Sequence, residues 1–381
     1  MTQLEPTAFT IAVPETELQN LKQRLRATRF PDAETVGDWS QGIPLGYVRE
    51  LCAYWAEQYD WRAREAALNR FGHFKLEVDG CEVHFQHLRS PNPDALPLIM
   101  THGWPGSIVE FQKVIAPLTD PESHGGSASD AFHLVCPSLP GFAFSGKPGA
   151  ATGWGVERIA DAWNTLMLRL GYDRYVAQGG DWGSMVSTTI GARHPDHCAA
   201  IHLTMPIVAP DPATLSELRD VELAALASLD HYRKHDSGYS KQQSTRPQTL
   251  GYALADSPAG QAAWILEKFW AWTDCDGHPE NVLSRDELLD NVMLYWLTNS
   301  ATSSARLYWE SFGSFATGKP RVPVGISIFP KEIFRTSERW ARKHFGELLH
   351  YNALDRGGHF AAFEQPELFI EEMRNCFRSV R

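Results

Sequence analysis

Asp181 lies where the surrounding sequence predicts a nucleophile. The local sequence is Gly179-Gly180-Asp181-Trp182-Gly183, with a β-branched and apolar run before it and a helix-compatible run after it. A strand, a tight glycine-rich turn and a helix together are typical of the sharp bend on which a hydrolase exposes its nucleophile. The alternative is a glycine-rich turn in which Asp181 caps the helix, since helix N-termini accept negative charge.

A carboxylate at this position restricts the chemistry. Attack by a carboxylate on an acyl carbon yields only a reactive anhydride, whereas attack on a saturated carbon yields an alkyl ester that water can cleave later. Asp181 therefore indicates a substrate with an electrophilic saturated carbon and a leaving group, such as an epoxide or an alkyl halide.

A second turn, His102-Gly103-Trp104-Pro105-Gly106, follows an apolar strand and precedes a predicted helix. In this layout such a turn contributes one backbone N–H to an oxyanion hole, and the residue after the nucleophile contributes the other. The backbone amides of Trp104 and Trp182 are thus the expected oxyanion-hole donors, and both residues are expected to border the substrate.

His359, in Gly357-Gly358-His359-Phe360, follows the last predicted strand, where a hydrolase of this layout holds its base. It must be neutral to take a proton from water, and a carboxylate should fix its tautomer. Glu332, just after the seventh predicted strand, is the favoured carboxylate. Asp355 and Glu338 compete with it, but Asp355 is very close to His359 in sequence and Glu338 lies inside a helical run.

Opening an epoxide needs a proton donor, because the oxygen otherwise leaves as an alkoxide. A phenol is suitable, since a pKa near 10 keeps it protonated at neutral pH. The helical insertion described below holds five tyrosines: Tyr232, Tyr239, Tyr252, Tyr295 and Tyr308. A halide would instead need fixed N–H donors, of which the Trp182 indole is one.

No metal or cofactor is expected. His231 and His235 have the i, i+4 spacing of a metal site, but no carboxylate ligand accompanies them, and an exposed helix face explains them better. The sequence has neither a phosphate-binding loop nor a dinucleotide-binding fingerprint.

Composition limits the partners and the compartment. The chain has 381 residues, 43% of them hydrophobic, which is enough for one large core and an appended piece. A net charge of −11 without long Lys/Arg blocks argues against nucleic acid and anionic membranes. The six cysteines form no C-x-x-C pair, so reduced core thiols are expected. With neither a signal peptide nor a long apolar run, the sequence predicts a soluble, cytoplasmic protein.

From about residue 73 the chain alternates strand-like and helix-like segments, which is typical of a mostly parallel sheet covered by helices. The predicted strands are 75–78, 82–87, 96–100, 133–136, 175–178, 200–204, 322–327 and 348–353. Predicted helices among them are 107–116, 156–170 and 183–193.

Two segments lie outside this alternation. Residues 208–315, after the sixth predicted strand, are helix-rich and aromatic, with one helix starting at Ser257-Pro258 and another at 286–299. They are expected to form a lid whose aromatic side chains both pack and line a pocket. Residues 1–72 carry amphipathic helices at 17–28 and 45–59 and are expected to wrap around the main domain. The predicted division is an extension (1–72), a core in two parts (73–207 and 316–381) and a lid (208–315).

These motifs together resemble the microsomal-type epoxide hydrolases of the α/β-hydrolase superfamily, a group that also includes insect juvenile-hormone epoxide hydrolases and soluble microbial members. The resemblance covers nearly the whole chain. The matching segments are 21–25, 38–39, 59–62, 65 and 68–69 near the N-terminus, 102–107, 140–142, 179–183 and 357–360 in the core, and 256–260 and 266–269 in the lid. Membrane-bound members carry an N-terminal anchor helix that is not expected here.

The resemblance implies an α/β-hydrolase fold, with a mostly parallel doubly wound sheet, a helical lid and an N-terminal extension. It places the nucleophile on Asp181, the base on His359, the acid on Glu332, and the two ring-opening phenols on Tyr308 and Tyr239. Tyr232 and Tyr252 remain alternatives to Tyr239.

The expected activity is cofactor-independent hydrolysis of an epoxide to a vicinal diol. A haloalkane dehalogenase with the same three residues is the alternative enzyme, and an inactive hydrolase-fold binding protein is the alternative from another class. The aromatic lid favours a bulky apolar or aryl epoxide as the small-molecule partner, in detoxification, catabolism or secondary metabolism. The oligomeric state, including a homodimer, is left open.

Overall fold

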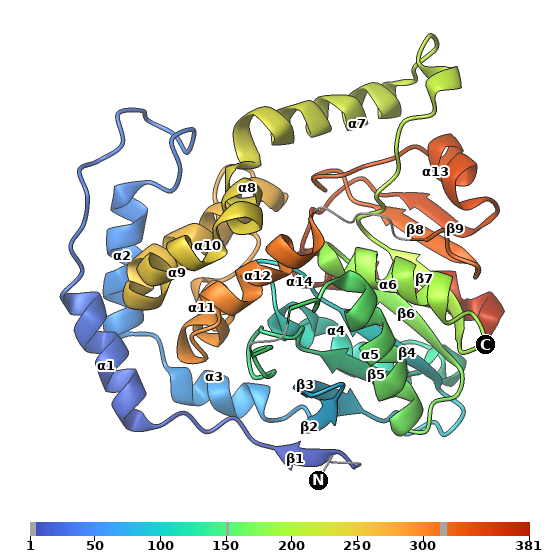
Figure 1. Cartoon of the computed structure of the whole chain (residues 1–381), viewed down its shortest axis with the longest axis horizontal. Helices are drawn as coiled ribbons and strands as arrows, with labels where there is room; N and C mark the ends of the chain where they lie inside the picture. The colour runs from blue at the N-terminus through green and yellow to red at the C-terminus, as the bar shows by residue number, and fades with distance from the viewer. Residues whose placement is uncertain (1–4, 150–151, 313–317) are drawn as a thin grey trace.

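The computed structural model describes residues 5–149, 152–312 and 318–381 and is built on a nine-stranded sheet (Figure 1). The strands are β1 (Thr7–Phe9), β2 (His73–Val78), β3 (Cys81–Leu88), β4 (Leu96–Thr101), β5 (Phe132–Pro137), β6 (Tyr175–Gly179), β7 (Cys198–Leu203), β8 (Val324–Ile328) and β9 (Leu348–Ala353). Their order in the sheet is β1-β2-β3-β5-β4-β6-β7-β8-β9. From β5 to β9 all neighbours are parallel, whereas β1, β2 and β3 add an antiparallel edge.

The mostly parallel sheet predicted from the sequence is confirmed. Each of the eight predicted strands lies within two residues of an observed one, and β1 is the strand that was not predicted. The insertion that follows the sixth predicted strand follows β7 in the structure, because β1 shifts the count by one.

Helices cover both faces of the sheet. On one face lie α4 (Gln112–Thr119) and α15 (Pro366–Phe377), which pack against each other, and on the other lie α5 (Val156–Arg169) and α6 (Trp182–Arg193). Figure 1 shows α4, α5 and α6 beside the sheet. Side chains of β4 alternate between these layers, since Leu98 and Met100 pack with α4 and α15 while Ile99 packs with α5 and α6. This alternation follows from the two-residue period of a strand, and burial on both faces explains why the central strands are apolar throughout.

The lid is helical in its described part. Its helices are α7 (Asp220–His231), α8 (Gly238–Thr245), α9 (Pro247–Asp256), α10 (Pro258–Trp272), α11 (Arg285–Leu297) and α12 (Ala301–Ser311). Ser257 caps α10 as predicted, because its hydroxyl accepts the Gly260 amide at 3.0 Å with Pro258 in the first turn. The predicted boundary between lid and core, at residues 315 and 316, falls outside the described residues.

The N-terminal segment packs on the lid as well as on the sheet. It contains α1 (Glu15–Arg26), α2 (Leu45–Glu57) and α3 (Trp61–Leu68), which lie beside α9, α10 and α11 in Figure 1. The Arg64 guanidinium and the Tyr59 hydroxyl both bond to the buried Asp290 carboxylate of α11, at 2.9 and 2.7 Å. Trp39 stacks on Trp270 of α10 with ring centroids 5.0 Å apart. The segment therefore fixes the lid from outside.

Two short helices, α13 (Glu338–Phe345) and α14 (Ala361–Glu364), complete the second part of the core. All six cysteines lie in the described part of the chain, where they are buried free thiols, as predicted. No helix within the described ranges has the length and apolar character needed to cross a membrane.

Candidate active site

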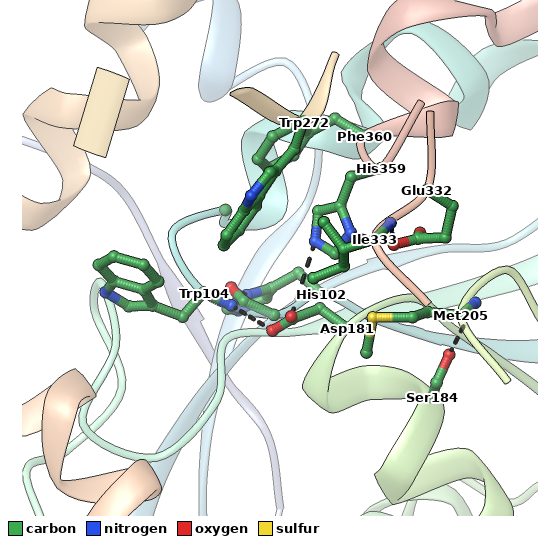
Figure 2. A network of polar contacts seen from close by, with 12 residues as sticks. His102, Trp104, Asp181, Ser184, Met205, Trp272, Glu332, Ile333, His359 and Phe360 are labelled. Atoms are coloured by element: carbon green, nitrogen blue, oxygen red, sulfur yellow. Dashed lines mark hydrogen bonds and ion pairs between the residues drawn. The ribbon is translucent and has the colours of Figure 1, made fainter. Parts of the chain in front are cut away.

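Four loops at the carboxyl ends of parallel strands meet in one place. Trp104 follows β4, Asp181 follows β6, Glu332 follows β8 and His359 follows β9. Figure 2 shows the side chains of Asp181, His359 and Glu332 converging, with the backbone amide of Trp104 directed at the Asp181 carboxylate and the Trp104 indole directed away from it. Because parallel strands end at the same edge of a sheet, residues that are far apart in sequence come together there.

Asp181 lies on a sharp bend that depends on glycines. Its backbone has φ +48° and ψ −127°, a conformation that non-glycine residues rarely adopt. A Cβ on Gly179 would lie 2.0 Å from the Gly183 carbonyl carbon, and one on Gly183 would lie 1.9 Å from the Thr101 carbonyl oxygen. Gly179 therefore lets β6 and the start of α6 meet closely, and Gly183 lets α6 approach the end of β4. Asp181 is the N-cap residue of α6, but its side chain makes no N-cap hydrogen bond of the usual kind, which counts against capping as its main role.

The Asp181 carboxylate is held by two backbone amides. Trp104 donates its N–H to Oδ1 at 2.8 Å, and the Trp182 amide bonds to the same carboxylate. Burial raises the pKa of Asp181, and His359 and the two amides oppose that rise. A Cβ on Gly103 would lie 2.1 Å from Oδ1, so only glycine allows the turn to approach this closely.

His359 lies between two carboxylates. Its Nδ1 is 2.8 Å from Glu332 Oε1, and its Nε2 is 3.6 Å from Asp181 Oδ2. Its backbone amide donates to the Trp272 carbonyl at 2.9 Å, which fixes the loop against the lid. Burial alone would lower the pKa of His359, but Glu332, Asp181 and Glu110 outweigh that effect and raise it to about 9.

Glu332 orients the imidazole ring. Besides contacting His359, its Oε1 accepts the Ile333 amide at 2.7 Å, and the side chain is almost fully buried. Glu338 instead pairs with Arg342, 2.8 Å away. Within the described residues neither Glu338 nor Asp355 contacts His359, so the structure brings together the favoured carboxylate and not its competitors.

The two tyrosines assigned from the resemblance lie over Asp181. Tyr239 of α8 and Tyr308 of α12 are buried, line the same cavity as Asp181 and have ring centroids 5.8 Å apart. The Tyr308 hydroxyl makes no hydrogen bond of ordinary geometry to the described residues, although the side chains of Tyr239 and Trp182 are polar neighbours that act to lower its pKa. Burial raises the pKa of both phenols well above their ordinary value, and the Asp181 charge adds to this rise. Both phenols are therefore protonated donors.

The other three lid tyrosines differ in position. Tyr232 lines the cavity, and its hydroxyl lies 3.2 Å from that of Tyr239 and 3.3 Å from Ser240 Oγ. Tyr295 points away and donates to the Gly106 carbonyl at 2.7 Å. Tyr252 is 71% exposed. Of the two alternatives to Tyr239 as the second proton donor, Tyr232 therefore lies in the cavity beside Tyr239, whereas Tyr252 lies outside it.

The cavity above Asp181 has a volume of about 520 Å³ and is mostly apolar. Its lining residues are Asp181, Trp182, Met185, Met205, Ile207, Leu229, Tyr232, Arg233, Ser237, Tyr239, Ser240, Lys241, Tyr308, Phe312, Ile333 and Phe334. Trp182 borders it as expected, whereas the Trp104 indole lies behind Tyr239, stacked on that ring at 4.8 Å. Trp104 therefore supports the tyrosine side chain.

A buried ionic group below Tyr239 was not predicted. Lys268 of α10 is 5% exposed, pairs with Asp236 and with Glu267, and places its Nζ 5.0 Å from the Tyr239 ring centroid. Asp236 also accepts the Trp272 indole N–H, and the Trp272 carbonyl holds the His359 amide. The network thus links Tyr239 in the lid to His359 in the core. The available sequence signal was a lysine within an apolar and aromatic helix.

His102 has a structural position in the turn. Its Nδ1 is 2.9 Å from the Gly103 carbonyl oxygen, and its Nε2 is 3.2 Å from the Leu139 amide. Burial lowers its pKa to about 4, so it is neutral and rigidly placed. Across residues 5–149, 152–312 and 318–381, no group of three or more His, Cys, Asp or Glu side chains has an arrangement that could hold a metal ion. His231 and His235 are exposed on α7 and the turn after it.

Two protein families match the chain. The family described as "Epoxide hydrolase N terminus" matches residues 6–111, and that described as "alpha/beta hydrolase fold" matches residues 97–248. The Stigmatella aurantiaca protein named "Putative epoxide hydrolase" is 56% identical over 98% of this chain and 85% of its own length. Epoxide hydrolase 1 of Sus scrofa is 37% identical over 96% of this chain and 87% of its own length.

Solved structures agree with this similarity. The crystal structure of juvenile hormone epoxide hydrolase from the silkworm Bombyx mori has a TM-score of 0.90 and 30% identity, covering 100% of this chain and 96% of that one. The Aspergillus niger epoxide hydrolase has a TM-score of 0.90 and 31% identity, covering 100% and 98%. The α/β-hydrolase fold implied by the resemblance is confirmed.

Proposed function

The chain belongs to the epoxide hydrolase family, and we propose that it converts an epoxide to a vicinal diol through an ester on Asp181, without a cofactor. The observation that carries this mechanism is the position of the Asp181 carboxylate, which lies between two backbone amides, a Glu332-paired His359 and a pair of buried phenols.

In the first step the two carboxylate oxygens have different roles. Oδ1 is fixed by the Trp104 amide, whereas Oδ2 faces His359 at 3.6 Å and is free to attack. As Oδ2 bonds to an oxirane carbon, the C–O bond of the ring breaks, and its electron pair goes to the oxygen. The phenols of Tyr239 and Tyr308 bind that oxygen and donate a proton to it.

In the second step water attacks the ester carbonyl. His359 Nε2 takes a proton from the water, and the imidazolium is stabilised by Glu332 through Nδ1. Oδ1 has become the carbonyl oxygen and is already bonded to the Trp104 amide. The Trp182 amide, which also bonds to the Asp181 carboxylate, is the second donor that stabilises the tetrahedral oxyanion. When the Cγ–Oδ2 bond breaks, the departing oxygen takes the proton held by His359 and the diol is released. The second proton of the water restores the phenol that was deprotonated in the first step, and the oxygen from water stays in the Asp181 carboxylate.

The two phenols favour an epoxide over a haloalkane. They are protonated and face the nucleophile across an apolar cavity, as an alkoxide leaving group requires. The cavity also supports a bulky apolar epoxide as the substrate. An inactive binding protein would not need this complete set of polar groups. The six buried, unpaired thiols support a reducing compartment, and we place the enzyme in the cytoplasm.

Heavy-oxygen water tests the mechanism. In a single turnover with excess enzyme, the label should enter the Asp181 carboxylate and be absent from the first diol released. His359→Gln should stop at the ester, so the intact-protein mass should rise by the mass of the epoxide. Label in the first diol alone would show direct attack by water and remove Asp181 from the nucleophilic role.

A substrate panel tests the reaction class. Aryl, alkyl and terpenoid epoxides should give diols, while a matched panel of haloalkanes should give no halide. Halide release without diol formation would establish the dehalogenase alternative instead, and binding without either product would establish the inactive binding protein.

A further inference from the structure

The outer part of the active-site cavity carries two cations that have no acidic partner. Arg233 and Lys241 line the cavity and are exposed, together with the partly exposed apolar side chains Ile207 (39%) and Phe312 (37%). Asp181 is only 7% exposed. The lining thus runs from a buried nucleophile to an open mouth that is both apolar and basic.

Neighbouring cations differ from these two. Lys234 pairs with Asp230 at 2.7 Å, and Lys268 pairs with Asp236 and Glu267. In the described part of the chain Arg233 and Lys241 form no ion pair, and the residues outside it contain no Asp or Glu. Their charges are therefore not neutralised by any carboxylate of this chain.

This local charge is opposite to that of the protein as a whole. The chain has a net charge of −11, yet Asp181 is the single acidic side chain among the lining residues. A substrate anion placed at the bottom would face Asp181 and lose its hydration, at a high free-energy cost. The same anion at the mouth would keep part of its hydration and lie beside two cations.

We propose that the substrate is an amphiphilic epoxide with an apolar body and a carboxylate at the end remote from the oxirane. The oxirane would lie at Asp181 and the phenols, the apolar body along Met185, Leu229 and Phe334, and the carboxylate between Arg233 and Lys241. This assignment rests on the proposed function and narrows its substrate class.

Matched substrates test it. The probes are 10,11-epoxyundecanoate and its methyl ester, which share an oxirane and a chain and differ in charge. The quantity compared is the ratio of kcat/KM for the acid to that for the ester, measured at low and at high salt. We expect this ratio to exceed one in the native enzyme and to fall as salt screens the mouth.

Charge-removing variants locate the effect. Arg233→Gln and Lys241→Gln should each lower the acid-to-ester ratio about threefold, and the double variant about tenfold, since exposed ion pairs contribute up to about 1 kcal/mol each. Lys234→Gln is the matched control, because it removes the same charge from an exposed site outside the cavity lining and should keep the native ratio. All of these side chains are exposed, so the variants should fold, which circular dichroism can verify.

The outcomes are distinct. A ratio of one or below in the native enzyme, or an unchanged ratio in the double variant, would overturn the carboxylate assignment while leaving epoxide hydrolysis in place. A ratio that falls equally in Lys234→Gln would also overturn it, since the effect would then come from net charge alone. Absence of diol from both probes and from the wider epoxide panel would instead contradict the proposed function.

Discussion

Replacing Tyr308 by Phe isolates the role of a phenol, because the structure shows what the hydroxyl does before substrate binds. The Tyr308 hydroxyl is buried and makes no hydrogen bond to the described residues, while the ring contacts Trp182 at a centroid distance of 4.8 Å. Phenylalanine keeps that ring contact and removes a polar atom that makes no hydrogen bond of ordinary geometry. The free energy of unfolding should therefore stay the same or rise slightly.

The catalytic cost should be large by comparison. A hydrogen bond to an oxygen that becomes charged only as the C–O bond breaks acts in the transition state alone. Loss of one oxyanion-hole donor costs about 2.7–4 kcal/mol, and a similar loss here would slow ester formation about 10²–10³-fold. Ester hydrolysis should be unaffected, since its oxyanion is held by the Trp104 and Trp182 amides.

Tyr239→Phe should give the same loss in ester formation with a small stability cost. Its hydroxyl lies 3.2 Å from that of Tyr232, and loss of this bond should cost about 0.5–1.5 kcal/mol. Tyr232→Phe should slow ester formation far less than Tyr239→Phe, since the Tyr232 hydroxyl is already bonded to Tyr239 and Ser240. Tyr252→Phe, at a 71% exposed position, is the matched control and should leave both steps at the native rate.

The assay is single-turnover quenching of tryptophan fluorescence, because Trp182 borders the cavity and contacts Tyr308. Mass spectrometry of acid-quenched samples would count the ester directly. If Tyr308→Phe forms ester at the native rate but hydrolyses it slowly, our account of proton donation is wrong. If Tyr232→Phe is slow in ester formation while Tyr239→Phe is not, the second donor is Tyr232.

Three further predictions concern the groups around the phenols. Gly103→Ala should abolish most activity, because its Cβ would lie 2.1 Å from Asp181 Oδ1; ester formation by mass spectrometry should fall at least 100-fold. Ester hydrolysis should become faster as the pH rises through the pKa of His359. In the free enzyme the Asp181 charge helps to raise that pKa to about 9, and the ester has lost this charge, so the pKa in the ester should lie below 9. The decay of the isolated ester after a pH jump measures this. Lys268→Met should lower the free energy of unfolding by about 3–5 kcal/mol in a urea titration, because it leaves the Asp236 side chain, which is only 11% exposed, without its cation.

The two substitutions each have a control variant, and the pH prediction has an outcome that would contradict it. Gly37→Ala should be silent, since nothing lies within 4 Å of a Cβ at that position. Lys234→Met removes an exposed lysine from its pair with Asp230 and should change stability by less than about 1 kcal/mol. A hydrolysis rate that declines between pH 6 and pH 9 would show that His359 is not the base in the second step.

Local spacing made much of the site predictable. The elbow at Asp181 could be inferred because the close approach of α6 to the ends of β6 and β4 requires glycine at Gly179 and Gly183, and that requirement is visible as a short motif. The Glu332 position followed from strand order, since acid and base lie after successive parallel strands, β8 and β9. In both cases a local constraint determines which residues can occupy the position.

What could not be predicted depends on contacts between distant segments. β1 has only three residues, which is too short for an alternating pattern to be recognised in the sequence. Its partner β2 follows in the chain only after α1, α2 and α3. The partners of Lys268 lie on α10 and at the end of the π-helical segment Tyr232–Asp236 before α8, and only the folded lid brings them near Tyr239. The choice between Tyr239 and its neighbours likewise depended on helix orientation, because Tyr232 is only seven residues away.

In the proposed mechanism, the charge of Asp181 provides a physical reason for the order of the two half-reactions. In the resting site it faces His359 at 3.6 Å and, with Glu332 and Glu110, raises the pKa of the imidazole to about 9. A protonated His359 stabilises the ionised nucleophile and cannot act as a base, so water is not activated before the substrate arrives. Alkylation removes the charge of Asp181, lowers the proton affinity of His359 and produces the neutral imidazole when an ester is present for water to attack. The event that creates the ester therefore also creates the base that cleaves it.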